Sequence, residues 1–315
     1  MGPPSSTIHN PPSTIDPSGT LDSMSERSVR LRRIAIRAAR VAALGLGIPF
    51  VLIAVIAMAF GDRFIFLPSR HPEGEWQARD HASIQVDEVE YTVADGTRLV
   101  AWHSRPTNPR CTFLYFHGNA GNISHRLFVL ESLASIGVAT FGVDYRGYGK
   151  SGGSPSEKGI LADGEGSWAH LTVRIGEPPE RIVLFGKSLG GVPAIDLAAK
   201  VKCAGLIVQS SFTSIPDIAS RAIPIFPLRW FMKSTMDNRK RIAQARCPVL
   251  VVHSRDDEII PFEHGVKLHA AAPAPNWFAE FQGVGHNDLI EVRREEWLRD
   301  LDQFLTRIGL PRKDR

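Results

Sequence analysis

Short apolar runs alternate with helical patterns along most of the chain after residue 83. Ile84–Val93 and Thr97–Trp102 are separated by Ala94-Asp95-Gly96, a turn typical of a hairpin, so we expect these two strands to pair. The later runs are rich in β-branched and aromatic residues and are bounded by breakers, as buried parallel strands are. They are Thr112–Phe116, Val138–Val143, Ile182–Phe185, Gly205–Val208, Val249–Val252 and a weaker last run, Phe278–Phe281.

Helical stretches such as Ser124–Ile136 and Gly191–Val201 lie between these runs. An alternation of strands and helices predicts an open, mostly parallel sheet with helices on both faces. Such sheets place their functional sites at the carboxyl ends of the strands.

Val41–Gly61 is a stretch of 21 residues without a charge. At about 1.5 Å per residue it is long enough to cross a hydrocarbon core of roughly 30 Å. Arginines gather on its amino-terminal side, whereas Asp62 and Arg63 cancel on the other side. The positive-inside rule then predicts a cytoplasmic tail and a main domain outside. We therefore expect a transmembrane anchor at 41–61 and a catalytic domain over 62–315.

Two alternatives to the anchor stay open. Ala57-Met58-Ala59 matches a cleavage site, which would make the segment a secretory signal. A buried core helix is the other alternative, although core helices usually carry a polar face. The preceding tail, 1–40, is predicted to be disordered because residues 1–23 are rich in Pro and Ser. Met24 is a second candidate for the start of the chain.

Composition narrows the class of protein. The 315 residues are 43% hydrophobic and 22% charged, as in a globular protein, and the mean hydropathy of −0.08 excludes a multi-span membrane protein. Of the net charge of +4, residues 1–40 contribute +3, which leaves +1 for the remainder. This distribution leaves no electrostatic footprint for nucleic acid.

Three cysteines without a C-x-x-C pattern exclude a disulfide-rich scaffold and give no zinc-site signal. Cys203 and Cys247 begin strands that we expect to be neighbours, so a disulfide is one option outside the cell. Free buried cysteines are the default.

The clearest chemical motif is Gly186-Lys187-Ser188-Leu189-Gly190, which follows one predicted strand and precedes a helix. A serine hydroxyl needs exposure, positioning and a base to become a nucleophile. A sharp strand-to-helix turn exposes it, and flanking glycines let the chain turn that tightly. We therefore predict Ser188 as the nucleophile.

The base and the acid follow in the order that this type of hydrolase uses. Three acids follow a predicted strand, of which Asp257 is our choice, Asp256 is second and Glu258 is expected to point away. His286 lies in a glycine-flanked loop after the last strand. The loops at this edge converge, so His286 can reach Ser188 with Asp257 behind it.

A developing oxyanion needs fixed N–H donors. Leu189 supplies the first candidate, and Asn119 in the loop Phe116-His117-Gly118-Asn119-Ala120-Gly121-Asn122 supplies the second. His117 is expected to brace this loop. A plain glycine- and asparagine-rich turn is the alternative. A later stretch from Asp144 to Ser151 is not a phosphate loop, because aspartate stands where such a loop needs glycine.

Together these motifs resemble the α/β-hydrolase superfamily: His117-Gly118-Asn119, Asp144-Tyr145-Arg146-Gly147-Tyr148-Gly149, Gly186-Lys187-Ser188-Leu189-Gly190-Gly191, Asp257 and Gly285-His286. More closely, the chain is similar to the single-span, membrane-anchored serine hydrolases of the alpha/beta-hydrolase-domain group, which includes lipases, protein depalmitoylases and bacterial relatives. The similarity runs from about Asp62 to Leu310. Ser254 is a departure, since glycine is more usual there.

The resemblance implies an eight-stranded, mostly parallel sheet and a Ser188–His286–Asp257 triad with an oxyanion hole at Asn119 and Leu189. It implies no metal or cofactor, and it makes Asp144–Gly149 a structural loop under the site. It also places a lid in the insertion at 211–246. We expect four aromatic residues of that insertion to line an acyl pocket: Phe212, Phe226, Trp230 and Phe231. A helix pair packed on the core and contact with the bilayer are the alternatives.

We therefore expect a serine hydrolase that cleaves a carboxylic ester or thioester through an acyl-enzyme. A serine peptidase or aminopeptidase, a cofactor-free haloperoxidase and a catalytically idle binding module remain alternatives. The substrate is expected to be a small acyl ester or an acylated molecule.

Overall fold

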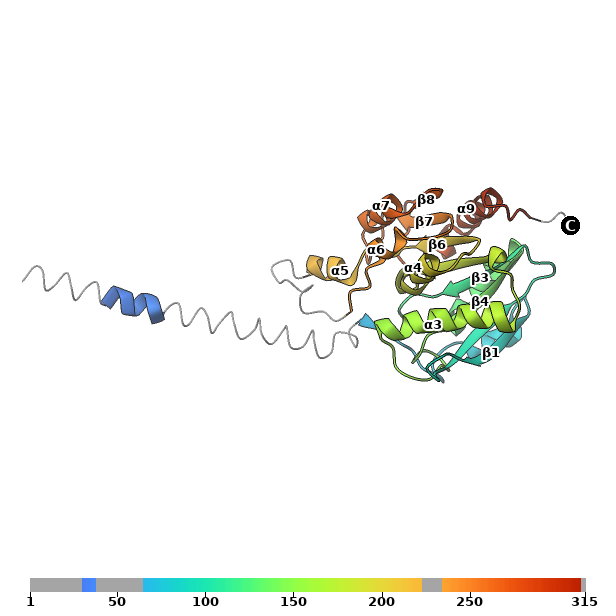
Figure 1. Cartoon of the computed structure of the whole chain (residues 1–315), viewed down its shortest axis with the longest axis horizontal. Coiled ribbons are helices and arrows are strands. Elements are labelled where there is room, and N and C mark those ends of the chain that lie inside the picture. The colour runs from blue at the N-terminus through green and yellow to red at the C-terminus, as the bar shows by residue number, and fades with distance from the viewer. Residues whose placement is uncertain (1–29, 38–64, 223–233, 313–315) are drawn as a thin grey trace, which may run out of the picture. The chain divides into compact units, whose positions relative to one another are not determined.

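The computed structural model describes residues 30–37, 65–222 and 234–312 (Figure 1). Residues 30–37 form an exposed helix that belongs to a unit separate from the rest. Within the described ranges, no helix has both the length and the apolar character needed to cross a bilayer. The predicted anchor, Val41–Gly61, lies outside those ranges, and so do residues 1–29 and 38–40 of the predicted tail.

Eight strands of the described chain form a single sheet in the order β1-β2-β4-β3-β5-β6-β7-β8. β1 and β2 form the predicted antiparallel hairpin, β2 is also antiparallel to β4, and every other pair is parallel. The mostly parallel sheet predicted from the sequence is therefore confirmed. The strands are β1 Val86–Thr92, β2 Arg98–Ser104, β3 Cys111–Phe116, β4 Val138–Asp144, β5 Ile182–Lys187, β6 Gly205–Gln209, β7 Val249–Ser254 and β8 Asn276–Phe281.

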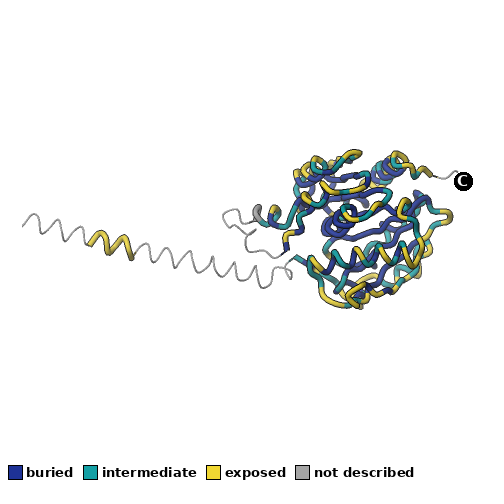
Figure 2. Tube along the Cα trace, viewed as in Figure 1, coloured by how far each residue is buried: buried dark blue, intermediate teal, exposed yellow. Residues whose placement is uncertain are grey.

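Helices cover both faces of the sheet, as predicted. Successive side chains of a strand point to opposite faces, and in β3 Leu114 and Phe116 join one core, whereas Phe113 and Tyr115 join the other. The first core is covered by α3 Glu157–Ala169, α4 Gly191–Lys200 and α7 Phe262–Ala271, and the second by α2 Leu127–Ser135 and α9 Arg294–Arg307. Figure 2 shows the strands as buried chain between helices whose outer sides are exposed.

Short helical turns complete the domain. They are Trp76–His81, Ile123–Arg126, His170–Arg174, Pro179–Arg181 and Ser188–Gly190, together with α8 Leu289–Val292. The predicted helix at Ser124–Ile136 is thus divided into a tight turn and α2. The backbone of Arg126, at φ −117° and ψ 11°, is not helical and separates the two. Asn122 caps the first turn, because its side chain accepts a hydrogen bond from Ser124 N at 3.1 Å.

The insertion before β7 is described in two parts, α5 Ile215–Ala222 and α6 Asn238–Ile242. α6 packs against α4 and α7, so this part of the predicted lid is a helix on the core. Three of the four aromatic residues predicted to line an acyl pocket, Phe226, Trp230 and Phe231, lie outside the described residues.

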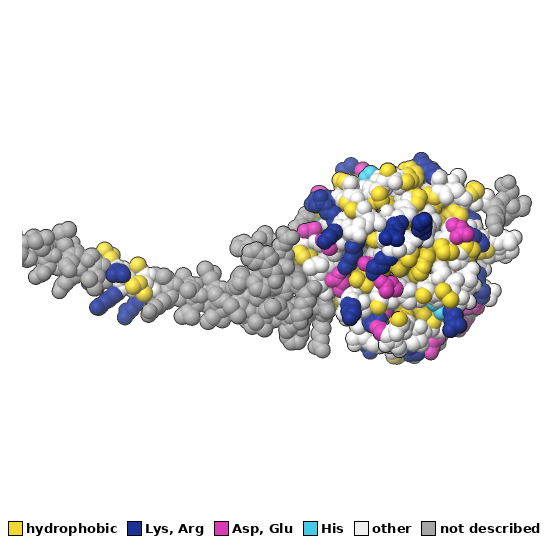
Figure 3. All heavy atoms as spheres, viewed as in Figure 1, with side chains coloured by type: hydrophobic (Ala, Val, Ile, Leu, Met, Phe, Trp, Pro, Cys, Tyr) yellow, Lys and Arg dark blue, Asp and Glu magenta, His cyan; other side chains and the backbone are white. Residues whose placement is uncertain are grey.

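Charged side chains on the face formed by α3, α4 and α6 are paired with one another. Figure 3 shows basic and acidic side chains interspersed on this face. Lys200 lies 2.6 Å from Glu165 and 2.7 Å from Asp196, and Arg241 lies 2.7 Å from Glu157. Exposed pairs of this kind each stabilise by only about 0–1 kcal/mol, but they neutralise the charge of each lysine and arginine locally.

The three cysteines, Cys111, Cys203 and Cys247, are free thiols. Cys203 and Cys247 each lie two residues before a strand, and these strands, β6 and β7, are neighbours, which agrees with the predicted adjacency. The neighbouring Cys247 thiol and burial raise the pKa of the Cys203 thiol well above its usual range.

Candidate active site

Ser188 lies in a sharp turn between β5 and α4, at the carboxyl end of the sheet. Its φ of +53° is in the left-handed region, which non-glycine residues rarely adopt. A β-carbon on Gly186 would collide with the Gly190 carbonyl oxygen, and one on Gly190 would collide with the Phe116 carbonyl oxygen. The two glycines of the motif are therefore needed for the close approach of β5, β3 and the turn.

His286 joins Ser188 to Asp257. The distance from His286 Nε2 to Ser188 Oγ is 3.1 Å, and His286 Nδ1 lies 2.8 Å from Asp257 Oδ2. The carboxylate fixes the proton on Nδ1, because a carboxylate accepts hydrogen bonds. Nε2 is thereby left with a lone pair that faces the serine hydroxyl. All three side chains are buried, so the structure brings together the three residues that the sequence predicted.

The main chain after Asp257 holds its carboxylate in place. Asp257 Oδ1 accepts hydrogen bonds from Ile259 N at 3.0 Å and from Ile260 N at 2.7 Å. Both carboxylate oxygens lie close to His286 Nδ1, Oδ1 at 3.0 Å and Oδ2 at 2.8 Å.

The neighbouring acids hold the loop that carries His286. Asp256 Oδ2 accepts a hydrogen bond from Gly283 N at 2.6 Å. This second candidate for the acid therefore binds the main chain of the histidine loop and not the imidazole of His286. Glu258 Oε2 accepts from the main-chain N–H of His286 at 3.0 Å. The expectation that Glu258 points away is therefore wrong: the close approach of the two loops at this edge brings it against the histidine.

Two further residues of β7 tie the acid loop to the sheet, and sequence reasoning did not assign them this part. Ser254 Oγ donates to Val284 O at 2.5 Å and accepts from Asp256 N at 3.2 Å. Burial lowers the pKa of His253, whose neutral ring donates from Nε2 to Ile260 O at 2.8 Å. The serine at position 254, which departs from the usual glycine, thus joins the acid loop to the histidine loop.

Asn119 uses its side chain to brace the loop after β3. Its Oδ1 accepts from Tyr148 Oη at 2.9 Å and from Leu67 N at 3.0 Å, and its Nδ2 donates to Ile65 O. The part predicted for Asn119 in an oxyanion hole therefore depends on its main-chain N–H. Asn119 and Leu189 line the same cavity as Ser188 and His286.

His117 has the bracing contacts expected of it. Its Nε2 lies 3.1 Å from Asp144 Oδ1, its Nδ1 lies 2.7 Å from Gly118 O, and its carbonyl accepts from Tyr145 Oη at 2.6 Å. Asp144 also accepts from Ile123 N at 2.7 Å. Asp144 and Tyr145, at the start of the loop after β4, thus hold the predicted oxyanion loop in place through these hydrogen bonds.

Residues 68–70, which precede the sheet, contact the loop after β3 and the loop after β4. No pattern in the sequence predicted these contacts. Pro68 pairs with Gly121 and Arg70 pairs with Gly149 in isolated parallel bridges. The main-chain oxygen of Ser69 accepts from Gly149 N at 2.9 Å. Ile65 and Leu67 of the same segment line the cavity over Ser188, so this segment borders the candidate site.

The cavity over Ser188 has a volume of about 260 Å³. Its lining is mostly apolar and includes Ile65, Leu67, Leu189, Phe212, Ile215, Ile218, Ile259 and Ile260. Phe212 is thus the one predicted pocket residue within the described chain, and it lines the cavity. Two cations, Arg126 and Lys187, line the same cavity.

Burial, together with the positive charge of Arg126, lowers the pKa of Lys187 to about 8. The charges of Asp257, Glu291 and Asp288 act in the opposite direction. Lys187 is therefore a strongly perturbed group in the wall of this cavity.

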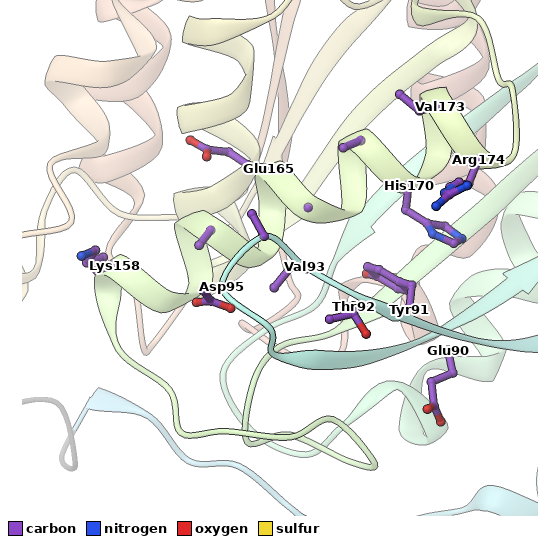
Figure 4. A pocket seen from close by; sticks show the side chains of 14 residues that line it. Glu90, Tyr91, Thr92, Val93, Asp95, Lys158, Glu165, His170, Val173 and Arg174 are labelled. Carbon is purple, nitrogen blue, oxygen red and sulfur yellow. The ribbon is translucent and has the colours of Figure 1, made fainter.

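A larger cavity, of about 850 Å³, lies between the turn of the β1–β2 hairpin and α3 (Figure 4). Its labelled side chains include Asp95, Lys158 and His170, and none of the predicted site residues lines it. Size alone therefore does not locate the candidate site, whereas the arrangement of Ser188, His286 and Asp257 does.

Comparisons with known proteins agree with the fold. A family model described as serine aminopeptidase, S33, matches residues 107–231. An esterase of Pyrococcus furiosus, Pf2001, superposes with a TM-score of 0.64 at 22% identity, over 77% of this chain and 100% of that one. This likeness establishes the fold, which is that of the α/β hydrolases.

Sequence relatives define the family more closely. Alpha/beta hydrolase domain-containing protein 17B of Homo sapiens is 32% identical over 250 residues, which cover 78% of this chain and 83% of that protein. An uncharacterized protein of Mycobacterium tuberculosis is 35% identical over 214 residues, 67% of this chain and 76% of that protein. The chain belongs to the alpha/beta-hydrolase family that includes these proteins, and this membership supports a hydrolase activity.

Proposed function

We propose that the protein is a serine hydrolase that cleaves carboxylic esters, or thioesters, through an acyl-enzyme. The observation that carries this proposal is the continuous chain of contacts from Ser188 Oγ through His286 to Asp257. A serine with a positioned, correctly protonated imidazole can attack a carbonyl, whereas an isolated serine cannot.

In the proposed reaction, Ser188 Oγ attacks the substrate carbonyl carbon while its proton passes to His286 Nε2. The carbonyl oxygen becomes an oxyanion that accepts hydrogen bonds from the main-chain N–H groups of Asn119 and Leu189. Asp257 stabilises the imidazolium. His286 then gives the proton to the leaving oxygen or sulfur, and the C–O or C–S bond breaks. Water, activated by the same imidazole, releases the acid and restores the serine.

The apolar part of the cavity supports an acyl group as the portion of the substrate that it holds. Phe212, Ile215 and Ile218 offer only hydrocarbon surface, and such surface binds alkyl chains through the hydrophobic effect. We extend this acyl pocket to Phe226, Trp230 and Phe231 as a proposal. Residues 41–61 are likewise proposed as a membrane anchor that precedes a catalytic domain over 62–315.

A serine aminopeptidase is the second candidate, because the matching family model carries that description. Aminopeptidases must hold the positive amino terminus of a peptide. Among the described residues that line the cavity there is no Asp or Glu, and two are cationic. Such a wall repels an ammonium group, so the electrostatics of the cavity favour an ester over a peptide substrate.

The test uses a fluorophosphonate probe on the full chain. The proposal predicts covalent labelling of the wild type and none of Ser188→Ala. The matched control is Ser211→Ala, which keeps the triad and loses only a hydrogen bond of 2.8 Å to the Ser188 carbonyl oxygen. Retained labelling of Ser188→Ala, or no labelling of a folded wild type, would contradict a serine hydrolase and support an idle fold.

A further inference from the structure

Lys187 lies beside the nucleophile and forms no ion pair with a carboxylate of the described residues. It precedes Ser188 directly, lines the cavity and is partly buried. No ion pair or hydrogen bond joins its ammonium group to another residue of the described chain. Lys200, on the outer face of the domain, instead has two carboxylates within 2.7 Å. Lys187 therefore carries a charge that the fold itself does not neutralise.

Arg126 brings a second positive charge to the same cavity. Its Nη2 donates to Ala120 O at 2.6 Å, which is a neutral acceptor. Its Nε is buried and has no hydrogen-bond partner among the described residues. Two like charges in a partly buried site repel each other, and the lowered pKa of Lys187 reflects both this repulsion and burial. An anion bound in this cavity would offset the repulsion between the two cations.

The position of Lys187 relative to His286 indicates which part of a substrate would carry that anion. The carboxylates whose charges act on Lys187 are Asp257, Asp288 and Glu291, and they lie behind or shortly after His286. Lys187 also lines the same cavity as His286 and Asn287, and that cavity has a volume of only about 260 Å³. A leaving group accepts its proton from His286 Nε2. The ammonium group therefore shares the cavity in which the leaving group departs.

We propose that Lys187 and Arg126 form a subsite for a negatively charged leaving group, so that the preferred substrate is an apolar acyl ester of an alcohol, phenol or thiol that carries a carboxylate or phosphate. This substrate class rests on the proposed hydrolase function and adds to it. The bond that breaks is still the acyl C–O or C–S bond. Lys187 acts as a specificity determinant that binds the anion, and it transfers no proton.

The test compares two chromogenic esters that differ in one charge. They are 3-butanoyloxy-4-nitrobenzoate, which releases an anionic phenol, and 2-nitrophenyl butanoate, which releases its neutral counterpart. The readout is the ratio of kcat/KM for the anionic ester to that for the neutral ester. In Lys187→Gln we expect this ratio to fall about tenfold, the order of one charge-assisted contact. Lys187→Arg should keep most of the wild-type ratio.

Lys158→Gln is the matched control, because it removes the same charge at the other cavity, and its ratio should equal that of the wild type. A second measurement separates binding from turnover: calorimetric titration with the product, 3-hydroxy-4-nitrobenzoate. Its affinity should fall about tenfold in Lys187→Gln. Fluorophosphonate labelling of Lys187→Gln reports whether the variant keeps a formed site.

The outcomes distinguish the two proposals. Labelling of Ser188 with an unchanged ester ratio and unchanged product affinity would overturn the anion subsite and leave the hydrolase intact. Product affinity that depends on Lys187, in a chain that neither labels nor turns over esters, would support the subsite and overturn the hydrolase. Equal loss of both esters in Lys187→Gln, with product affinity unchanged, would make Lys187 merely structural and overturn the subsite.

Discussion

The replacement Asp257→Asn tests most directly which of the three neighbouring acids orients His286. The amide oxygen can still accept from Ile259 N and Ile260 N, so the acid loop keeps the two hydrogen bonds that fix it. The amide nitrogen then takes the place of Oδ2, which is the nearer of the two oxygens to His286 Nδ1, at 2.8 Å against 3.0 Å for Oδ1. Because an amide nitrogen donates, Nδ1 must accept and the imidazole proton moves to Nε2.

That change removes the base from the nucleophile. Nε2–H then points at Ser188 Oγ, from which it lies 3.1 Å, and it can no longer accept the hydroxyl proton. Loss of the correct tautomer in a triad of this kind lowers kcat by about 10⁴. At about 1.4 kcal/mol for each factor of ten, this corresponds to about 5.5 kcal/mol of transition-state stabilisation.

The assay is hydrolysis of p-nitrophenyl butanoate, followed by the release of p-nitrophenolate, with thermal unfolding measured in parallel. Asp256→Asn is the matched control, because Asp256 accepts only from Gly283 N and does not reach the imidazole. We expect this control to lose less than about tenfold in kcat, the order of one hydrogen bond. If Asp257→Asn kept activity within tenfold of the wild type, or if Asp256→Asn were the more damaging change, the assignment of the acid would be refuted.

Other predictions follow from the turn, the cationic subsite and the insertion. Gly190→Ala should lower the free energy of unfolding in urea by about 2 kcal/mol or more, because the added β-carbon would collide with a main-chain carbonyl of β3. Gly152→Ala is the control, since its added β-carbon would meet its nearest atom at 3.5 Å, and it should lower the free energy of unfolding by less than about 1 kcal/mol. Equal losses in the two variants would contradict the packing argument. Binding of 4-nitrobenzoate, whose single negative charge is constant between pH 7 and pH 9, should be strongest below pH 8, where Lys187 is protonated, and should weaken as pH rises through the pKa of Lys187 of about 8. Calorimetry at pH 7 and pH 9 measures this, and affinity that stays constant would count against a role for the ammonium group. Alanine at both Trp230 and Phe231 should shift the chain-length preference in a series of p-nitrophenyl esters, and an unchanged preference would remove these two residues from the acyl pocket.

Much of the fold could be predicted because its signals are local. The runs that became β3, β4 and β5 are apolar on both faces, as strands between two helix layers must be. The Gly-Lys-Ser-Leu-Gly motif predicted the turn at Ser188, because a β-carbon on either glycine would collide with main-chain atoms of the turn or of the neighbouring strand.

The supporting contacts of the site could not be predicted in the same way. Glu258 and His286 are 28 positions apart, and Asn119 reaches a partner at Leu67 across 52 positions. Such contacts depend on how two loops pack against each other, and no periodicity in the sequence encodes this. The partial burial of Lys187 could not be predicted either, because a lysine at the end of a strand is usually exposed.

The central claim is that one hydroxyl, made reactive by the imidazole behind it, accepts the acyl group. The most direct measurement is mass spectrometry of the full chain, acid-quenched within milliseconds of mixing with p-nitrophenyl butanoate, followed by peptide mapping. The account predicts a butanoyl adduct on the peptide that contains Ser188, and no adduct in either Ser188→Ala or His286→Ala. An adduct on another residue, or continued turnover by Ser188→Ala, would contradict it.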